Sequence, residues 1–77
     1  MRKDYYCRDM TVARIRYTED RDTVEVLFLE SSRIYHLLKS NDKYLGILKK
    51  LEETSYGKKS VRVCFMSIES NIIEEVR

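Results

Sequence analysis

The chain contains no proline and only two glycines among its 77 residues. Disordered and linker-rich chains are usually rich in both residues, so their scarcity argues against a chain of that kind. The sequence also has no internal repeat and no low-complexity tract. We therefore expect residues 1–77 to form one small domain, with only residues 1–9, which are mostly polar, loosely ordered.

Histidine and cysteine are scarce as well. His36 is the single histidine, and Cys7 and Cys64 form no CxxC pair. Because catalytic and metal sites need several convergent groups at suitable spacing, we expect no cofactor, no metal site and no enzymatic activity. One disulfide is arithmetically allowed. Without a secretory signal, however, we expect both thiols to stay reduced, with Cys64 packed as a small hydrophobic side chain.

Long apolar runs and nucleotide-binding loops are missing too. No segment approaches the ~20 apolar residues that cross a bilayer. GxGxxG, Walker and GxSxG patterns do not occur. The segment 57–60, Gly-Lys-Lys-Ser, follows a predicted helix instead of preceding one, so no helix N-terminus would point at a phosphate there. These absences predict a cytoplasmic protein without a small-molecule substrate and without a membrane partner.

Neither sign of charge dominates, with fifteen basic and thirteen acidic side chains and a net charge of +2. A local patch nevertheless matters more than the sum. Six tyrosines and two phenylalanines supply stacking surfaces, and aromatic surfaces beside basic residues are typical of single-stranded nucleic-acid binders. Mixed charge is also the ordinary state of a solvated face. The basic residues predicted for such a surface are Arg14, Arg16, Lys58, Lys59 and Arg62.

The clearest positive signal is a hairpin. Residues 13–17 alternate apolar and basic side chains, and residues 24–29 are rich in β-formers, with a wholly polar turn between them. One register matches apolar with apolar and positive with negative, and a one-residue slip would exchange the two faces. The pairs predicted by this register are Ala13 with Phe28, Ile15 with Val26, Arg16 with Glu25 and Tyr17 with Val24.

Three apolar residues are left on the second face of this hairpin. They are Val12, Leu27 and Leu29. An exposed apolar patch often marks a protein contact. The helix or the N-terminal segment could instead cover these residues, because a small domain has little apolar surface to leave outside. We take the three residues as the predicted protein interface.

The rest of the chain predicts one helix and up to three more strands. Residues 31–39 fit either a third strand or a helix capped by Ser31 or Ser32, and their β-branched and aromatic content favours the strand. Residues 42–53 have apolar side chains at helical spacing after a capping segment, residues 40–42. Gly46 costs that helix up to about 1 kcal/mol relative to alanine. It either lets the helix approach the sheet closely or is simply tolerated.

The predicted fold is α+β and mainly β. It is a small curled five-stranded sheet, or a partly open barrel, with one helix in the order βββαββ. This order resembles that of the five-stranded OB-type barrel, a likeness of element order that no family motif accompanies. An SH3-like barrel and an open α+β sheet also fit. A helix at residues 31–39 would instead give a four-stranded sheet with two helices, ββααββ.

The function predicted from these features is a small non-catalytic binding module. It would engage a protein partner, or a second copy of itself, through a sheet face or edge. The alternative is an OB-like single-stranded nucleic-acid binder that uses the basic strand face.

Overall fold

The computed structural model describes residues 5–19, 21–57 and 59–77, so Lys58 lies outside the described residues. Within them, five strands and one helix follow the predicted order βββαββ. Residues 34–38 form a strand, which rules out the two-helix alternative. The elements are β1 (Tyr6–Arg16), β2 (Thr23–Phe28), β3 (Ile34–Leu38), α1 (Tyr44–Gly57), β4 (Ser60–Phe65) and β5 (Glu75–Val76).

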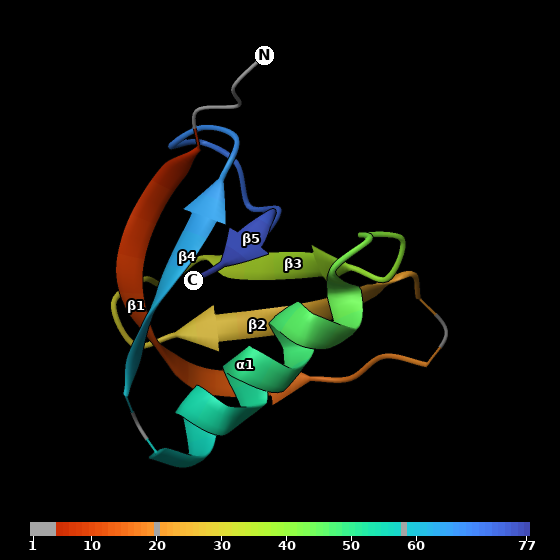
Figure 1. The fold of residues 1–77 in the computed structure, drawn as a ribbon, viewed down its shortest axis with the longest axis horizontal. Coiled ribbons are helices and arrows are strands. Elements are labelled where there is room, and N and C mark those ends of the chain that lie inside the picture. Colours follow the sequence, from red (N-terminus) through yellow and green to blue (C-terminus); the bar gives the residue numbers. More distant parts are fainter. Residues whose placement is uncertain (1–4, 20, 58) are drawn as a thin grey trace.

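The strands form one sheet in the order β3-β2-β1-β4-β5, in which all neighbouring strands are antiparallel. The long, curved β1 pairs with β4 along its first half and with β2 along its second half (Figure 1). β3 meets the chain before β5 at one isolated parallel bridge, His36 with Ile72. There the His36 N–H donates to the Asn71 carbonyl at 2.8 Å, and the Ile73 N–H donates to the His36 carbonyl at 2.9 Å. The sheet therefore curls toward closure but is not closed into a barrel.

The hairpin register is partly confirmed. Phe28 pairs with Val12 and not with Ala13, because the register shifts between Val12 and Arg14. Ala13 is the extra residue of a β-bulge, which bends a strand and changes the face to which the following residues point. The bulge brings Val12 to the core face, where it is only 4% exposed, so its predicted place on the second face is wrong. The predicted pairs that do occur are Ile15 with Val26 and Arg16 with Glu25.

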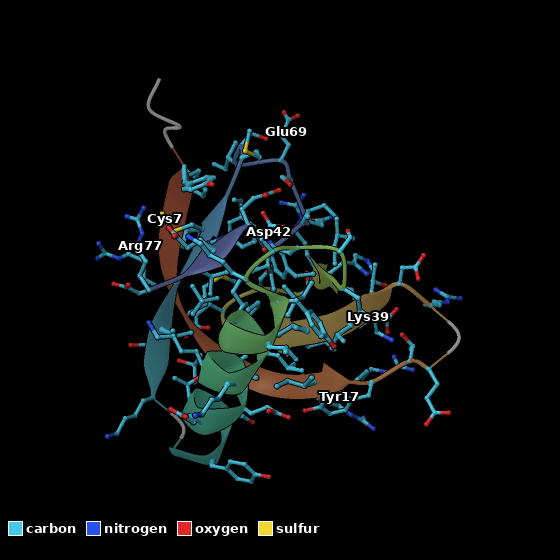
Figure 2. The ribbon with its side chains drawn as sticks, turned by 45° about the vertical axis from the view of Figure 1, so that its right-hand side comes forward. Cys7, Tyr17, Lys39, Asp42, Glu69 and Arg77 are labelled. Carbon is cyan, nitrogen blue, oxygen red and sulfur yellow. A yellow bond between two sulfur atoms is a disulfide. The ribbon has the colours of Figure 1, made fainter. Side chains whose placement is uncertain are left out.

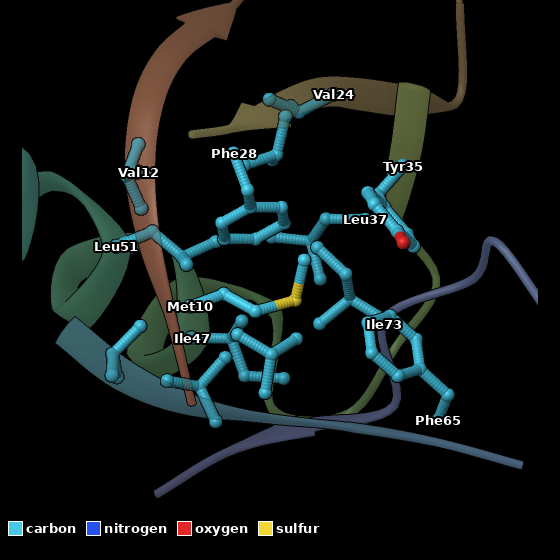
Figure 3. Close-up of a cluster of buried hydrophobic side chains, with 14 residues drawn as sticks. Met10, Val12, Val24, Phe28, Tyr35, Leu37, Ile47, Leu51, Phe65 and Ile73 are labelled. Atoms are coloured by element: carbon cyan, nitrogen blue, oxygen red, sulfur yellow. The ribbon is translucent and has the colours of Figure 1, made fainter. Parts of the chain in front are cut away.

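The core lies between the concave face of the sheet and α1 (Figure 3). The helix contributes Ile47 and Leu51, which are buried at the spacing of one helical turn. The Tyr35 ring lies with its centroid 5.4 Å from that of Phe28 and 5.1 Å from that of Phe65. These rings thus join β2 and β3 to β4 across the core. The other buried apolar residues of this cluster are Met10, Val12, Val24, Val26, Leu37, Val61, Val63, Ile73 and Val76.

The predicted capping segment does precede α1. The Lys43 N–H donates to Asn41 Oδ1 at 2.8 Å, and Asn41 Nδ2 donates to the Glu74 carbonyl at 3.2 Å. Asn41 therefore caps the helix and ties its start to the segment before β5. A Cβ atom placed on Gly46 would meet no atom within 4 Å, so a close approach to the sheet does not require this glycine.

The expectation of two free thiols is wrong. Cys7 on β1 lies directly opposite Cys64 on β4, with their Cα atoms 4.0 Å apart, and the two are joined by a disulfide (Figure 2). Cys64 is fully buried, as its place in a strand pattern predicted. The bond connects two residues that are 57 positions apart in the chain.

Candidate interaction surface

Two rows of side chains cross the outer face of β1, β2 and β3, on the side away from the core. The alternating burial along β2 places Leu27 on this face, and Ile34 of β3 lies opposite it. Ile34 is 42% exposed, and Leu29, just after β2, is 70% exposed. We call Leu27, Leu29 and Ile34 the outer apolar strip. In register, the rows are Arg14, Leu27 and Ile34, and then Arg16, Glu25 and His36.

The outer apolar strip contains two of the three residues predicted for a protein interface, Leu27 and Leu29. The third, Val12, lies in the core because of the bulge. Ile34 was missed as a surface residue, since the sequence left open whether its segment is a strand or a helix. The period-two pattern of β3, with Tyr35 and Leu37 buried, is the signal that could have placed Ile34 outside.

Charges of both signs flank the strip. Arg14 is exposed beside Leu27 and has no ion pair within the part of the chain that the structure describes. Glu30 follows Leu29, and its Oε1 accepts a hydrogen bond from the Thr11 N–H at 2.7 Å. This hydrogen bond is the main reason that the pKa of Glu30 lies below its ordinary value, so the carboxylate is charged at neutral pH.

The predicted basic residues do not gather into one patch. Arg14 and Arg16 share the outer face of β1, but Arg16 Nε lies 3.7 Å from Glu25 Oε1. Arg62 on β4 lies opposite Asp9, with Nε 3.2 Å from its Oδ1. Asp9 and Arg14 are roughly 16 Å apart along the strand, at about 3.3 Å per residue. The last described residue of the set, Lys59, is exposed in the connection before β4, away from the outer face of β2 and β3.

Sequence reasoning also missed a group of tyrosines where the end of β1 passes α1. The Tyr17 hydroxyl donates a hydrogen bond to Glu52 Oε2, and Figure 2 shows Tyr17 just past the end of β1. This hydrogen bond, with burial and the Glu52 charge as smaller causes, raises the pKa of Tyr17 to about 12. Tyr17 lies beyond the last residue of β1, so its predicted ladder pair with Val24 does not form.

Two shallow hollows lie on either side of Tyr17. The first hollow, between β1 and α1, has a volume of about 190 Å³. The second hollow has a volume of about 210 Å³. Glu52, Ser55 and Tyr56 reach the first hollow because residues three and four apart share a helix face. A spacing of four between Glu52 and Tyr56 is visible in the sequence, but the contact with Tyr17 depends on how α1 packs against β1. The first hollow is lined by Ile15, Tyr17, Glu52, Ser55 and Tyr56, and the second by Tyr17, Thr18, Glu19, Val24, Lys39 and Tyr44.

Over the described ranges, no group of three or more His, Cys, Asp or Glu side chains is placed to hold a metal ion. His36 is half-buried at the bridge between β3 and the segment before β5, and its Nδ1 has no hydrogen-bond partner among the described residues. In the same part of the chain, no helix is long and apolar enough to cross a membrane.

Comparisons of the chain with protein-family models, with curated proteins and with solved structures find no match. We therefore infer function from the outer face of the sheet and from the charges around it.

Proposed function

We propose that this chain is a small non-catalytic binding module whose outer sheet face binds a second copy of the chain. The observation that supports this proposal is the outer apolar strip, in which Leu29 and Ile34 are exposed next to Leu27. A domain of this size has little apolar surface to leave in water. Contiguous exposed apolar residues of this kind often mark a protein contact.

The charges around the strip favour a second copy as the occupant. In a two-fold interface the same patch meets itself, so a self-complementary face needs both signs of charge around its apolar centre. Arg14 lies beside Leu27, and Glu30 follows Leu29. Two facing copies can therefore bury their strips together while Arg14 of one copy lies near Glu30 of the other. Exposed ion pairs contribute only about 0–1 kcal/mol each, so the apolar contact supplies the affinity and the charges set the orientation.

Sedimentation velocity at increasing protein concentration tests this proposal. We expect a reversible increase in sedimentation coefficient for the wild type, and its loss in Ile34→Asp, which places a charge in the strip. Ile34→Thr is a second variant at the same position. It keeps a β-branched side chain, so the strand should still form. Leu45→Asp is the matched control, because Leu45 is 77% exposed on α1, outside the strip. A wild type that stays monomeric at every concentration, or equal effects of Ile34→Asp and Leu45→Asp, would contradict the proposal.

A second candidate function is the binding of single-stranded nucleic acid. It rests on a finer description of the fold, in which the curled sheet with its bridge from His36 to Ile72 is a partly open OB-type barrel. In such barrels the face of the second and third strands binds oligonucleotides. The specific observation that favours this function is that Arg14 and Arg16 share the adjoining outer face of β1. Glu25 beside Arg16 weakens it.

Fluorescence anisotropy of labelled single-stranded DNA and RNA distinguishes the two functions. Two phosphate contacts predict a log–log salt slope of only about −1.4, and Arg14→Ala combined with Arg16→Ala should abolish that binding. If binding weakens with salt at about this slope and is lost in this double variant, the nucleic-acid function replaces self-association. If no binding occurs at low salt, the nucleic-acid function is wrong.

We also propose the cytoplasm as the compartment of this chain, and the Cys7–Cys64 disulfide makes that proposal testable. Cytoplasmic thiols are kept reduced, whereas disulfides persist in oxidising compartments. If the chain lies in the cytoplasm, alkylation of intact cells before lysis should trap two free thiols per chain. Quantitative recovery of the disulfide would place the protein in an oxidising compartment instead.

A further inference from the structure

The hollow of about 190 Å³ between β1 and α1 combines aromatic and acidic groups. The tyrosines on its lining are Tyr17 and Tyr56, and Tyr56 is 92% exposed. Glu52 contributes a carboxylate, and Ser55 contributes a hydroxyl group. Among the described residues, no lysine or arginine lines this hollow, and Glu52 forms no ion pair. The lining is therefore negative and aromatic.

Electrostatics decide which ligand such a lining favours. The face of an aromatic ring carries a negative partial charge and attracts cations that lie within about 6 Å of the ring centroid. The Tyr17 hydroxyl donates a hydrogen bond to the Glu52 carboxylate, and this bond holds both groups in place. Because the pKa of Tyr17 is raised to about 12, this tyrosine stays neutral and keeps donating over the physiological range. An anion would be repelled by Glu52, and a purely apolar side chain would remove water from the carboxylate without replacing its hydrogen bonds.

We propose that this hollow binds the guanidinium group of an arginine side chain that another protein presents. A guanidinium is planar, stacks on aromatic rings and pairs with carboxylates through several N–H donors. The rings of Tyr17 and Tyr56 would provide the stacking surfaces, and Glu52 would accept hydrogen bonds from the cation. The site lies on the helix side of β1 and not on its outer face, so it is independent of the outer apolar strip.

The test uses the short peptide acetyl-Gly-Arg-Gly-amide and the same peptide with citrulline, which has a similar shape without the charge. Nitrogen–proton correlation spectra of the oxidised protein, at constant ionic strength, report where each peptide binds. We expect saturable shifts confined to residues 15–17 and 52–56 with the arginine peptide. The citrulline peptide should bind about tenfold more weakly, because it loses both the cation–π and the ionic attraction.

Variants separate this site from a structural role of its residues. Glu52→Gln keeps an acceptor for the Tyr17 hydroxyl and should weaken arginine binding about three- to fivefold. Tyr17→Phe keeps the ring and should still bind, whereas Tyr56→Leu removes an exposed ring and should weaken binding. Glu53→Gln, at the next helix position, is the matched control and should change nothing. Equal binding of the two peptides, shifts elsewhere on the protein, or wild-type affinity in Glu52→Gln would overturn the proposal.

Discussion

Reduction of the Cys7–Cys64 disulfide should remove roughly half of the stability of this domain. A disulfide stabilises a fold mainly by restricting the unfolded chain, and the effect grows with the length of the loop that it closes. Here the two cysteines are 57 residues apart. A loop of that length corresponds to about 4 kcal/mol at 25 °C. A domain of fewer than about 80 residues rarely gains more than about 3–5 kcal/mol from its core alone.

Urea unfolding followed by circular dichroism measures this contribution directly, with and without a phosphine reductant. For a small protein with a slope of about 1 kcal/mol per molar urea, a loss of about 4 kcal/mol lowers the midpoint by roughly 4 M. A double variant, Cys7→Ser with Cys64→Ala, is the control, and the reductant should leave its midpoint unchanged. If the free energies of unfolding of the oxidised and the reduced wild type differ by less than about 1 kcal/mol, the chain-entropy reasoning fails for this protein.

Four further predictions concern single side chains. Gly46→Ala should raise the free energy of unfolding by up to about 1 kcal/mol, because the added methyl meets no neighbour; a lower melting temperature would contradict this. Leu51→Ala should lower the free energy of unfolding by about 2–5 kcal/mol in urea titrations, since Leu51 is fully buried. Because the pKa of Tyr17 is raised from 10.0 to about 12, its stabilisation is complete below pH 10 and lost as the pH rises through 12. Tyr17→Phe should flatten the alkaline limb of the stability–pH curve, and an unchanged limb would count against the Glu52 hydrogen bond. The pKa of Glu75 is lowered, mainly by its hydrogen bond with Lys43, so its stabilisation is present above its ordinary pKa of 4.5 and lost as the pH falls below it. Glu75→Gln should therefore reduce the loss of stability between neutral and acid pH, and an equal loss in both proteins would refute this.

The elements that local patterns specify were predictable. Alternation over residues 13–17 and charge matching correctly placed Ile15 opposite Val26 and Arg16 opposite Glu25. The β-branched and aromatic content of residues 34–38 correctly favoured a strand over a helix. The short polar side chain of Asn41 correctly indicated the start of α1.

The features that failed depend on contacts between distant segments. The bulge at Ala13 accompanies the bend of β1 as the strand passes from β4 to β2, and no local pattern marks it. Once that bulge is present, Val12 changes face and enters the core. The disulfide likewise requires the register between β1 and β4, which joins segments more than fifty residues apart.

The candidate sites follow the same division. Leu27 and Leu29 were correctly placed on the second face of the hairpin because they follow the alternation along residues 24–29, and their role in an interface stays a prediction. Arg62 was grouped with Arg14 because strand order was unknown, although Arg14 lies on the second half of β1 and Arg62 lies on β4, opposite the first half of β1. The hollow at Tyr17 required the packing of α1 on β1, which helical periodicity alone does not orient.

The most direct test of the outer apolar strip is a dilution series of nitrogen–proton correlation spectra on the oxidised wild type. Self-association through the strip predicts that the backbone amide signals of residues 27–29 and 33–35 shift with concentration and approach a plateau. The signals of Lys49, Lys50 and Glu53, which are exposed on α1, should stay constant. Spectra that do not change with concentration, or changes confined to α1, would contradict the assignment of the outer sheet face as the interaction surface.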